Sequence, residues 1–404
     1  MIHDLDDILS VNIKHMKRSA IRELLKLISR PEIISFAGGL PSPESFAVAE
    51  LKEVIDGVMD KEAALALQYG ATEGDTLLRE LLVQRYRKLG MDITIDNLII
   101  TTASQQALDL IAKMFLNRGD KIIVELPSYL GGLSAFNSYG GEAIGIPMDD
   151  HGMRADLLEA KLAELKKQGI KPKFIYIIPD FQNPAGVTMS EDRRKEIIKI
   201  AHKYDILILE DSPYRELRYE GKHQRTLYEM DGTGQVIMLC TFSKIFVPGF
   251  RIGWVIAHPD VLDKIVLGKQ ATDLCTPAFN QRIAARYIEK GYLDSKIQQI
   301  IEQYKVKKKV MLDSLDEFMP KGVTWTKPEG GLFLQLTCPE SINTNDLLLK
   351  AIDQEYVAFV AGSSFYCDGG GLNTMRLNFS YMPADKTHEG IKRLANVIKH
   401  EIEQ

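Results

Sequence analysis

The chain has 404 residues, of which 45% are hydrophobic and 26% charged, and its formal net charge at pH 7 is −5. This is the composition of an ordinary globular protein, and its small acidic excess argues against nucleic acid or an anionic membrane as a partner. The length exceeds the roughly 250–300 residues at which one hydrophobic core stops growing, so we expect two domains.

The start of the chain and its cysteines favour a cytoplasmic protein. The first residues show neither the basic and apolar regions of a signal peptide nor a membrane-spanning run. The four cysteines are far apart, which argues against a disulfide framework and fits a reducing compartment. The eight histidines lack ligand spacing, so we expect no metal site.

The first two thirds of the chain predict a large α/β domain. A helix over 19–28 and the extended segment "ISFAGGLPSPESF" form an N-terminal segment, 1–46, which we expect to join the smaller domain. From 47 to 285, helical patterns alternate with apolar strands, so we expect a mostly parallel sheet with helices on both faces. The predicted strands lie near 98–101, 121–125, 173–178, 205–210, 236–240 and 251–257.

The remaining residues, 286–404, predict a linking helix and a smaller α+β domain. One long helical stretch covers about 280–318. Beyond it, we expect strands at 330–336, 357–360 and 374–380, and helices at 344–355 and 385–402.

Several predicted strands end in polar residues, where open α/β sheets bind ligands. In "TTASQQALDL", Ser104 and Gln105 open a helix whose free N–H groups and dipole favour an anion, although Ser104 also reads as a plain helix cap. Tyr129 follows the next strand, where it either stacks on a flat ligand or packs in the core. Asn183 lies in the turn "QNPAG".

Two further strands end in charged residues. Asp211 in "DSPY" closes one strand, with Tyr214 three residues later, and a lone aspartate there is usually a cap. In "TFSKIFVPGFRIGW", Lys244 and Arg251 lie between two apolar strands. Because a buried charge is costly unless it is paired or functional, this is either a solvated loop or a pair of cations around one anionic, carbonyl-bearing ligand.

Taken together, the motifs resemble those of the class I/II aminotransferases, fold-type-I enzymes that use pyridoxal 5′-phosphate (PLP). The similarity is greatest to the 2-aminoadipate and kynurenine aminotransferase-like group. It covers nearly the whole chain and rests on five motifs in family order: "SFAGGLPSPESF", "QYGATEGDTLLREL", "QNPAG", "DSPY" and "SKIFVPGFRIGW", followed by "RLNFS".

The resemblance implies a role for each polar residue. Lys244 would hold PLP as a Schiff base and then move the substrate proton. Asp211 would pair with the pyridinium nitrogen, while Tyr214 and Asn183 bond the phenolic oxygen and Tyr129 stacks on the ring. The phosphate would be held, or its pocket lined, by Ser104, Gln105, Thr241, Ser243 and Arg251.

The resemblance also implies the substrate contacts and a homodimer. Tyr69 would reach the phosphate of the neighbouring subunit's site. Arg376 would clamp the substrate α-carboxylate, near Gly39 and Asn183. Without the resemblance, we would expect the strand face that Arg376 shares with Asn378 to meet solvent. Arg22 would bind acidic side chains, the alternative being a surface residue that pairs with Glu23.

General chemistry agrees with these roles. A carboxylate favours protonation of a ring nitrogen, and a desolvated lysine is a better nucleophile. The planar fork of arginine suits a carboxylate. The chain departs from the family at Ala103, where glycine is usual, and at Thr241, where serine is frequent. Both keep the N–H or hydroxyl group, so we expect the phosphate site to survive.

We therefore expect an enzyme that moves the amino group of an α-amino acid to a 2-oxo acid, with 2-oxoglutarate as acceptor. A PLP-dependent lyase, decarboxylase or racemase would use the same lysine and aspartate, because a fold does not decide the reaction. A PLP-sensing transcription regulator needs a winged helix-turn-helix ahead of residue 47, for which we expect no room. The sequence does not identify the amino donor.

Overall fold

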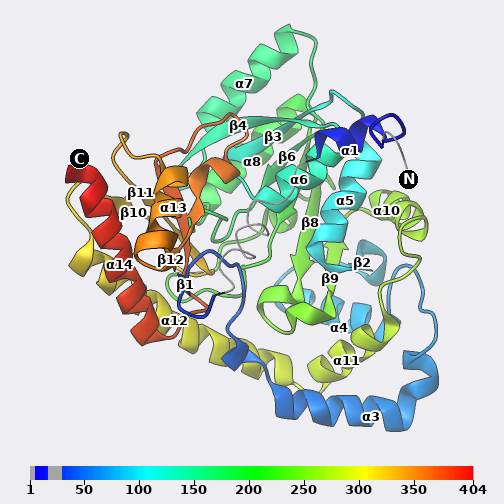
Figure 1. Ribbon diagram of the computed structural model, residues 1–404. Helices are drawn as coiled ribbons and strands as arrows, with labels where there is room; N and C mark the ends of the chain where they lie inside the picture. Colours follow the sequence, from blue (N-terminus) through cyan, green and yellow to red (C-terminus); the bar gives the residue numbers. More distant parts are fainter. Residues whose placement is uncertain (1–4, 17–29, 404) are drawn as a thin grey trace.

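The computed structural model describes residues 5–16 and 30–403 (Figure 1). The helix expected over 19–28, and Arg22 within it, lie outside the described residues. The described strands form sheets of eight, four and two strands. Nowhere in the described ranges is a helix long and apolar enough to cross a membrane.

The eight-stranded sheet has the order β2-β9-β8-β7-β6-β3-β4-β5. Its central strands β4, β3, β6, β7 and β8 are parallel, while β2, β9 and β5 pair antiparallel at the two ends. This confirms the expected mostly parallel sheet. The bounds are β2 Leu98–Thr101, β3 Lys121–Leu126, β4 Glu142–Asp149, β5 Gly152–Met153, β6 Phe174–Ile177, β7 Leu207–Asp211, β8 Val236–Thr241 and β9 Gly253–Ile256.

Helices cover both faces of this sheet, because successive strand residues point to opposite sides. Val124 belongs to the core beneath α5 and α6, whereas its neighbour Ile123 belongs to the core beneath α7 and α8. Each fully buried aliphatic or aromatic side chain stabilises the fold by about 1.5–3 kcal/mol. The bounds are α5 Ala103–Phe115, α6 Leu130–Ser138, α7 Ala155–Lys167, α8 Glu191–Tyr204, α9 Leu227–Asp231 and α10 Pro259–Gln270.

Two strands of the large sheet begin two residues later than the sequence pattern suggests. Asp205 adopts a left-handed conformation, with φ 52°, at the end of α8, so β7 starts only at Leu207. Arg251 is also left-handed, with φ 55°. Because this conformation interrupts the extended backbone ahead of β9, the strand starts only at Gly253.

A smaller four-stranded antiparallel sheet lies beside the large one, among the orange and red elements of Figure 1. Its order is β10-β11-β14-β13, and α13 and α14 pack in the same region. The bounds are β10 Thr324–Trp325, β11 Phe333–Thr337, β13 Val360–Ala361, β14 Thr374–Asn378, α13 Thr344–Gln354 and α14 Ala384–Glu403.

The single strand expected at 357–360 is wrong. Val357–Ala358 (β12) pairs with the N-terminal strand β1 (Ile34–Ser35), whereas β13 pairs with β14 in the four-stranded sheet. The buried Phe359 separates the two short strands. The pairing of β1 with β12 ties the N-terminal segment to the C-terminal part of the chain, as the blue and orange ribbons in Figure 1 show.

The long helical stretch expected over about 280–318 is helical but not continuous. It is two helices, α11 (Ala278–Glu289) and α12 (Tyr292–Phe318), which are separated at Gly291. With φ 77°, Gly291 takes the left-handed conformation that ends a helix at little cost for glycine. The other helices are α1 Val11–His15, α3 Val48–Ala66 and α4 Thr76–Lys88, with 3₁₀ helices η1 Pro43–Ser45, η2 Ile95–Asn97, η3 Phe242–Lys244, η4 Pro248–Phe250 and η5 Gly362–Phe365.

Candidate active site

Lys244 ends η3, directly after β8. Its Nζ donates a hydrogen bond of 2.8 Å to the carbonyl oxygen of Gly39, which the N-terminal segment brings across from β1. Burial, together with the smaller effect of the positive charges of Arg376 and Arg251, lowers the pKa of the Lys244 amine to about 8. The amine is therefore much closer to its neutral, nucleophilic form at pH 7 than a solvated lysine is.

Asp211 ends β7 and is 1% exposed. Its Oδ2 accepts a hydrogen bond of 2.8 Å from the hydroxyl of Tyr176, while its buried Oδ1 has no hydrogen-bond partner among the described residues. Burial raises the pKa of this carboxyl to about 7; the Tyr176 hydrogen bond opposes the rise, and the charge of Glu210 adds to it. An unpartnered buried carboxylate oxygen suits a cationic N–H group.

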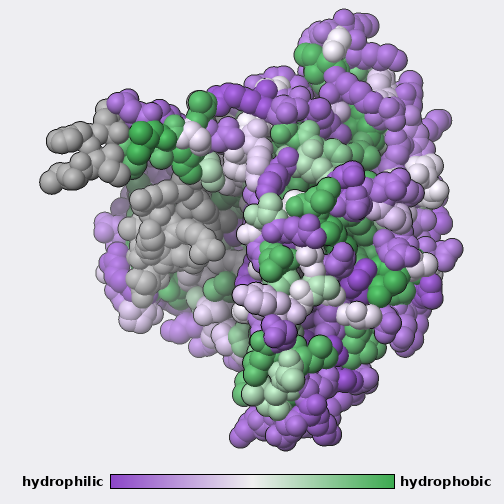
Figure 2. Space-filling view, turned by 90° about the vertical axis from the view of Figure 1, so that its right-hand side faces the viewer, coloured by the Kyte–Doolittle hydropathy of each residue, from purple (hydrophilic) through white to green (hydrophobic). Residues whose placement is uncertain are grey.

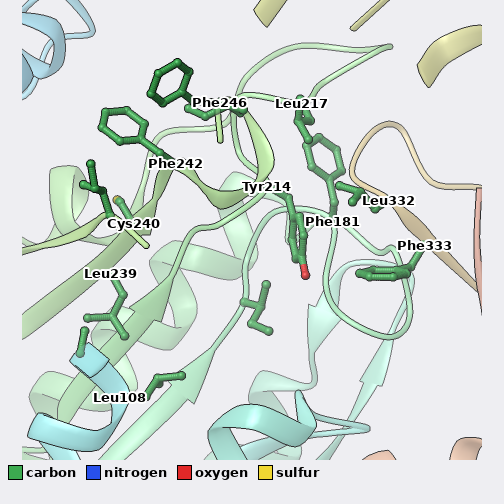
Figure 3. Packing of buried hydrophobic residues seen from close by; sticks show 14 of the residues in the cluster. Leu108, Phe181, Tyr214, Leu217, Leu239, Cys240, Phe242, Phe246, Leu332 and Phe333 are labelled. Atoms are coloured by element: carbon green, nitrogen blue, oxygen red, sulfur yellow. The ribbon is translucent and has the colours of Figure 1, made fainter. Parts of the chain in front are cut away.

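Asn183, Tyr214 and Arg376 form a connected chain of hydrogen bonds. Asn183 Nδ2 donates to the Tyr214 hydroxyl at 3.2 Å, and Arg376 Nη1 donates to Asn183 Oδ1 at 3.0 Å. Tyr214 lies edge-on to Phe333, with ring centroids 5.9 Å apart and planes at 90° (Figure 3). These residues come from the loop after β6, the loop after β7 and strand β14, so the site joins the two sheets.

Arg376 is 2% exposed, so the sequence alternative of a solvent-facing strand is wrong. The N-terminal segment covers this strand: Arg376 Nη2 donates to the carbonyl of Ala37 at 2.7 Å, and Asn378 N donates to the carbonyl of Phe36 at 2.9 Å. The guanidinium also lies over the ring of Phe333, 4.2 Å from its centroid. Burial lowers the pKa of Arg376 to about 10, and its Nε has no hydrogen-bond partner in the described part of the chain.

Hydroxyl groups and a cation gather at the other end of the site. Thr241 Oγ1 and Ser243 Oγ lie 2.9 Å apart, and Arg251 Nη1 donates to Ser243 Oγ at 3.5 Å. The start of α5 can lie beside them because Gly253 has no side chain. A Cβ at Gly253 would stand 2.7 Å from the backbone of Ala103, the first residue of α5. Hydroxyls, an arginine and a helix N-terminus together suit a phosphate group.

Four predicted residues remain to be placed. Ser104 is the second residue of α5 and is half-buried. Tyr129 precedes α6, and its ring folds over Gly131, where a Cβ would stand 2.5 Å from the ring. Gln105 Nε2 donates to the carbonyl of Gly131 at 3.1 Å. Tyr69 lies in the loop after α3, is 81% exposed, and does not join this cluster.

The structure adds Glu125 and Tyr176, which the sequence analysis did not single out. Glu125 ends the apolar run "KIIVE", and its Oε2 accepts hydrogen bonds from Ile178 N at 3.0 Å and Gln182 Nε2 at 3.3 Å. Burial raises the pKa of Glu125 to about 8. An acid inside an apolar strand was a usable signal, whereas Tyr176 in "KFIYII" looks like any core residue.

The donor set fits one composite ligand. The amine of Lys244 suits a carbonyl group, the orphaned oxygen of Asp211 suits a protonated ring nitrogen, and the cluster around Ser243 suits a phosphate. No group of three or more His, Cys, Asp or Glu side chains within residues 5–16 and 30–403 is placed to hold a metal ion.

A comparison with known families decides what this site is. The sequence profile described as Aminotransferase class I and II matches residues 33–398. The chain belongs to this aminotransferase family. The aminotransferase is 52% identical to aromatic-amino-acid aminotransferase 1 of Thermococcus litoralis over 390 residues, which cover 96% of this chain and 93% of the relative.

Solved structures agree. The aminotransferase superimposes on Pyrococcus horikoshii kynurenine aminotransferase with a TM-score of 0.96, at 49% identity and covering 100% of both chains. It superimposes on the α-aminoadipate aminotransferase of Thermus thermophilus, solved with N-(5′-phosphopyridoxyl)-L-leucine, with a TM-score of 0.91, at 34% identity and covering 99% of each. The predicted family, fold-type-I architecture, PLP cofactor and amino-group transfer are confirmed.

Ala103, the departure from the family pattern, leads to a prediction for the aminotransferase. Its φ is 59°, a left-handed conformation that costs an L-residue roughly 1–2 kcal/mol and glycine little. We expect Ala103→Gly to leave the free energy of unfolding unchanged or to raise it by up to about 1 kcal/mol. Ala107→Gly, in the interior of the same helix, should lower it by about 1 kcal/mol. Denaturant unfolding of the apoenzymes measures both, and equal losses would contradict the strain at Ala103.

Proposed function

We propose that the aminotransferase passes the amino group of aromatic amino acids and 2-aminoadipate to 2-oxoglutarate. The observation that carries this proposal is Arg376, a buried arginine held in place beside Lys244 and Asn183. Every donor and acceptor of this reaction carries a carboxylate next to the reacting carbon, and the arginine fork binds both its oxygens. The donor classes follow the relatives named for aromatic amino acids, kynurenine and α-aminoadipate.

In this proposal the cofactor is held at three points. Lys244 binds it covalently through Nζ, Asp211 Oδ1 accepts the ring N–H, and Ser104, Gln105, Thr241, Ser243 and Arg251 bind its phosphate. Tyr214 and Asn183 bond the phenolic oxygen, and Tyr129 stacks on the ring. Bound PLP supplies an electron sink for the carbon that loses its proton.

Lys244 also carries the proton of the reaction. With the cofactor bound, the amine of Lys244 would accept the substrate proton at Nζ and return it to a second carbon. Its pKa near 8 suits both directions, because acid–base catalysis works best when the pKa lies near the operating pH. The carbonyl oxygen of Gly39 accepts a hydrogen bond from Nζ at 2.8 Å and so holds the amine in position.

A panel of half-reactions tests the donors and the acceptor. The PLP form is mixed with single amino acids, and the aminated form with 2-oxoglutarate, pyruvate or glyoxylate, while the cofactor absorbance is followed. We expect aromatic donors, 2-aminoadipate and 2-oxoglutarate to react fastest. Faster reaction of pyruvate or glyoxylate would overturn the proposed acceptor.

We propose Arg22 as the partner of the second carboxylate of 2-oxoglutarate. Arg22→Ala should therefore raise KM for 2-oxoglutarate about tenfold, the scale of one charge-assisted bond, and leave KM for aromatic donors unchanged.

We further propose an active homodimer in which Tyr69 completes the partner's phosphate site. In support, Tyr69 is 81% exposed, and the apolar Leu65 and Leu67 beside it are 57% and 66% exposed. Figure 2 shows apolar patches of this kind on one face of the molecule. Apolar surface shielded from water on association is a main source of dimer stability.

Hybrid dimers test this arrangement. A Lys244→Ala chain mixed with a Tyr69→Ala chain forms hybrids in which one site has both wild-type residues. With random pairing, half the dimers are hybrids with one complete site, so activity should reach about a quarter of the wild-type value. Activity no higher than the mean of the two parents would show that Tyr69 serves its own chain.

We propose a cytoplasmic location. The four cysteines are free thiols, two of them buried, which is typical of a reducing compartment. Fractionation of the source cells tests this location. Enzyme in the membrane or secreted fraction would contradict it.

A further inference from the structure

We infer that Tyr176 is a positioning residue that holds Asp211 as an oriented anion for the cofactor's ring nitrogen. This inference rests on the proposed role of Asp211, and it assigns a function to a side chain inside the core. Tyr176 is 0% exposed, and its hydroxyl donates to Asp211 Oδ2 at 2.8 Å.

The sheet register brings the two side chains together. Tyr176 on β6 is the partner of Leu209 on β7. Leu209 and Asp211 are two residues apart on one strand, so they point to the same face as Tyr176. That face is the one covered by α5 and α6, and Tyr176 reaches the carboxylate from beneath α6.

Helix α6 prevents the Tyr176 ring from moving away. A Cβ at Gly132 would stand 2.9–3.0 Å from ring and hydroxyl atoms of Tyr176, so the ring packs directly against the helix backbone. Phe136, one turn later, meets the ring edge-on with centroids 5.2 Å apart. The hydroxyl therefore has a fixed position, and its hydrogen bond occupies one oxygen, Oδ2, of the Asp211 carboxylate. The other oxygen, Oδ1, is left for the ring nitrogen.

The charges around Asp211 show why a donor is needed. The charge of Glu210 on the same strand raises the pKa of Asp211, and the buried carboxyl of Glu125 on β3 also interacts electrostatically with Asp211. Cys240 on β8 and Tyr214 after β7 also interact with Asp211. Burial raises the pKa of the thiol and of the phenol, so both groups are neutral at pH 7. The hydrogen bond from the Tyr176 hydroxyl, in contrast, stabilises the Asp211 anion.

The test follows the protonation of the ring nitrogen by ¹⁵N NMR of apoenzyme reconstituted with ¹⁵N-labelled PLP. In Tyr176→Phe, the carboxyl of Asp211 should keep the proton, and the nitrogen signal should move from the pyridinium toward the neutral pyridine position. We expect kcat/KM to fall about 10- to 100-fold, the equivalent of one hydrogen bond to a charged group. Tyr219→Phe is the matched control, because this buried hydroxyl donates instead to the Gly331 carbonyl; its signal should stay at the pyridinium position.

A second variant disturbs the hydrogen bond between Tyr176 and Asp211 from the side of α6. Gly132→Ala should displace the Tyr176 hydroxyl and shift the nitrogen signal in the same direction, so the inference stays testable if Tyr176→Phe folds poorly. A wild-type nitrogen signal in Tyr176→Phe or in Gly132→Ala, with the signal of Asp211→Asn shifted, would overturn the inference. A wild-type signal in Asp211→Asn itself would instead overturn the proposed role of Asp211.

Discussion

Replacing Lys244 by alanine should lower kcat by at least about 10⁴-fold, the upper end of what one positioned acid–base group contributes. The expected loss is this large because, in the proposed function, one atom, Nζ, both binds the cofactor and carries the proton. The apoenzyme should stay folded, since Nζ is held by the carbonyl of Gly39 rather than by a carboxylate whose charge would be left unpaired. Steady-state kinetics and thermal unfolding of the same preparation measure the two effects.

Lys308→Ala is the matched control for this variant. Lys308 is 4% exposed but pairs with Glu220 at 2.6 Å and donates to the carbonyl of Pro328 at 3.0 Å. Its loss should lower the free energy of unfolding by about 1–3 kcal/mol and leave kcat within a few-fold of wild type. A Lys244→Ala enzyme with more than a hundredth of the wild-type kcat would contradict the assignment.

Asp211→Asn should have the second largest effect. The change removes the negative charge at nearly constant shape, so the ring nitrogen would lose the group that we propose favours its protonation. We expect kcat to fall by about 10²–10³, the scale of removing one group that stabilises charge in a transition state. The affinity for PLP should fall less, because the covalent and phosphate contacts remain.

Glu125→Gln provides the comparison for Asp211→Asn. Glu125 is an equally buried carboxyl on β3, which is separated from β7 by β6, and burial raises its pKa to about 8, so it is mostly protonated at pH 7. Glutamine keeps an oxygen to accept from Ile178 N and Gln182, and activity should stay within a few-fold of wild type. Equal losses in the two variants would mean that burial, and not charge at Asp211, explains the effect.

The polar residues at strand ends could be predicted from the sequence because each follows a recognisable apolar run. Asp211, Lys244 and Asn183 lie one, four and five residues after such runs, and parallel strands bring their carboxyl ends to one edge of a sheet. The strand Glu142–Asp149 was not predicted, because Gly145 and Pro147 interrupt its pattern, as is typical near a sheet edge.

Contacts between distant segments could not be predicted from local pattern. Arg376 owes its burial to the N-terminal segment and to Phe333, which pairings far apart in sequence bring to it. Tyr176 contacts Asp211 only because β6 and β7 are adjacent in one register. The division of 357–360 into two strands likewise depends on which partners flank it, β1 on one side and β14 on the other.

Borohydride reduction of the PLP-loaded enzyme, followed by peptide mapping, tests the central assignment most directly. The reagent fixes the cofactor irreversibly to the amine that holds it, so the modified peptide identifies that residue without reference to activity. We predict one pyridoxyl-labelled peptide, carrying the label on Lys244, and no labelled peptide from Lys244→Ala. A label on any other lysine of the wild-type enzyme would contradict this account of the site.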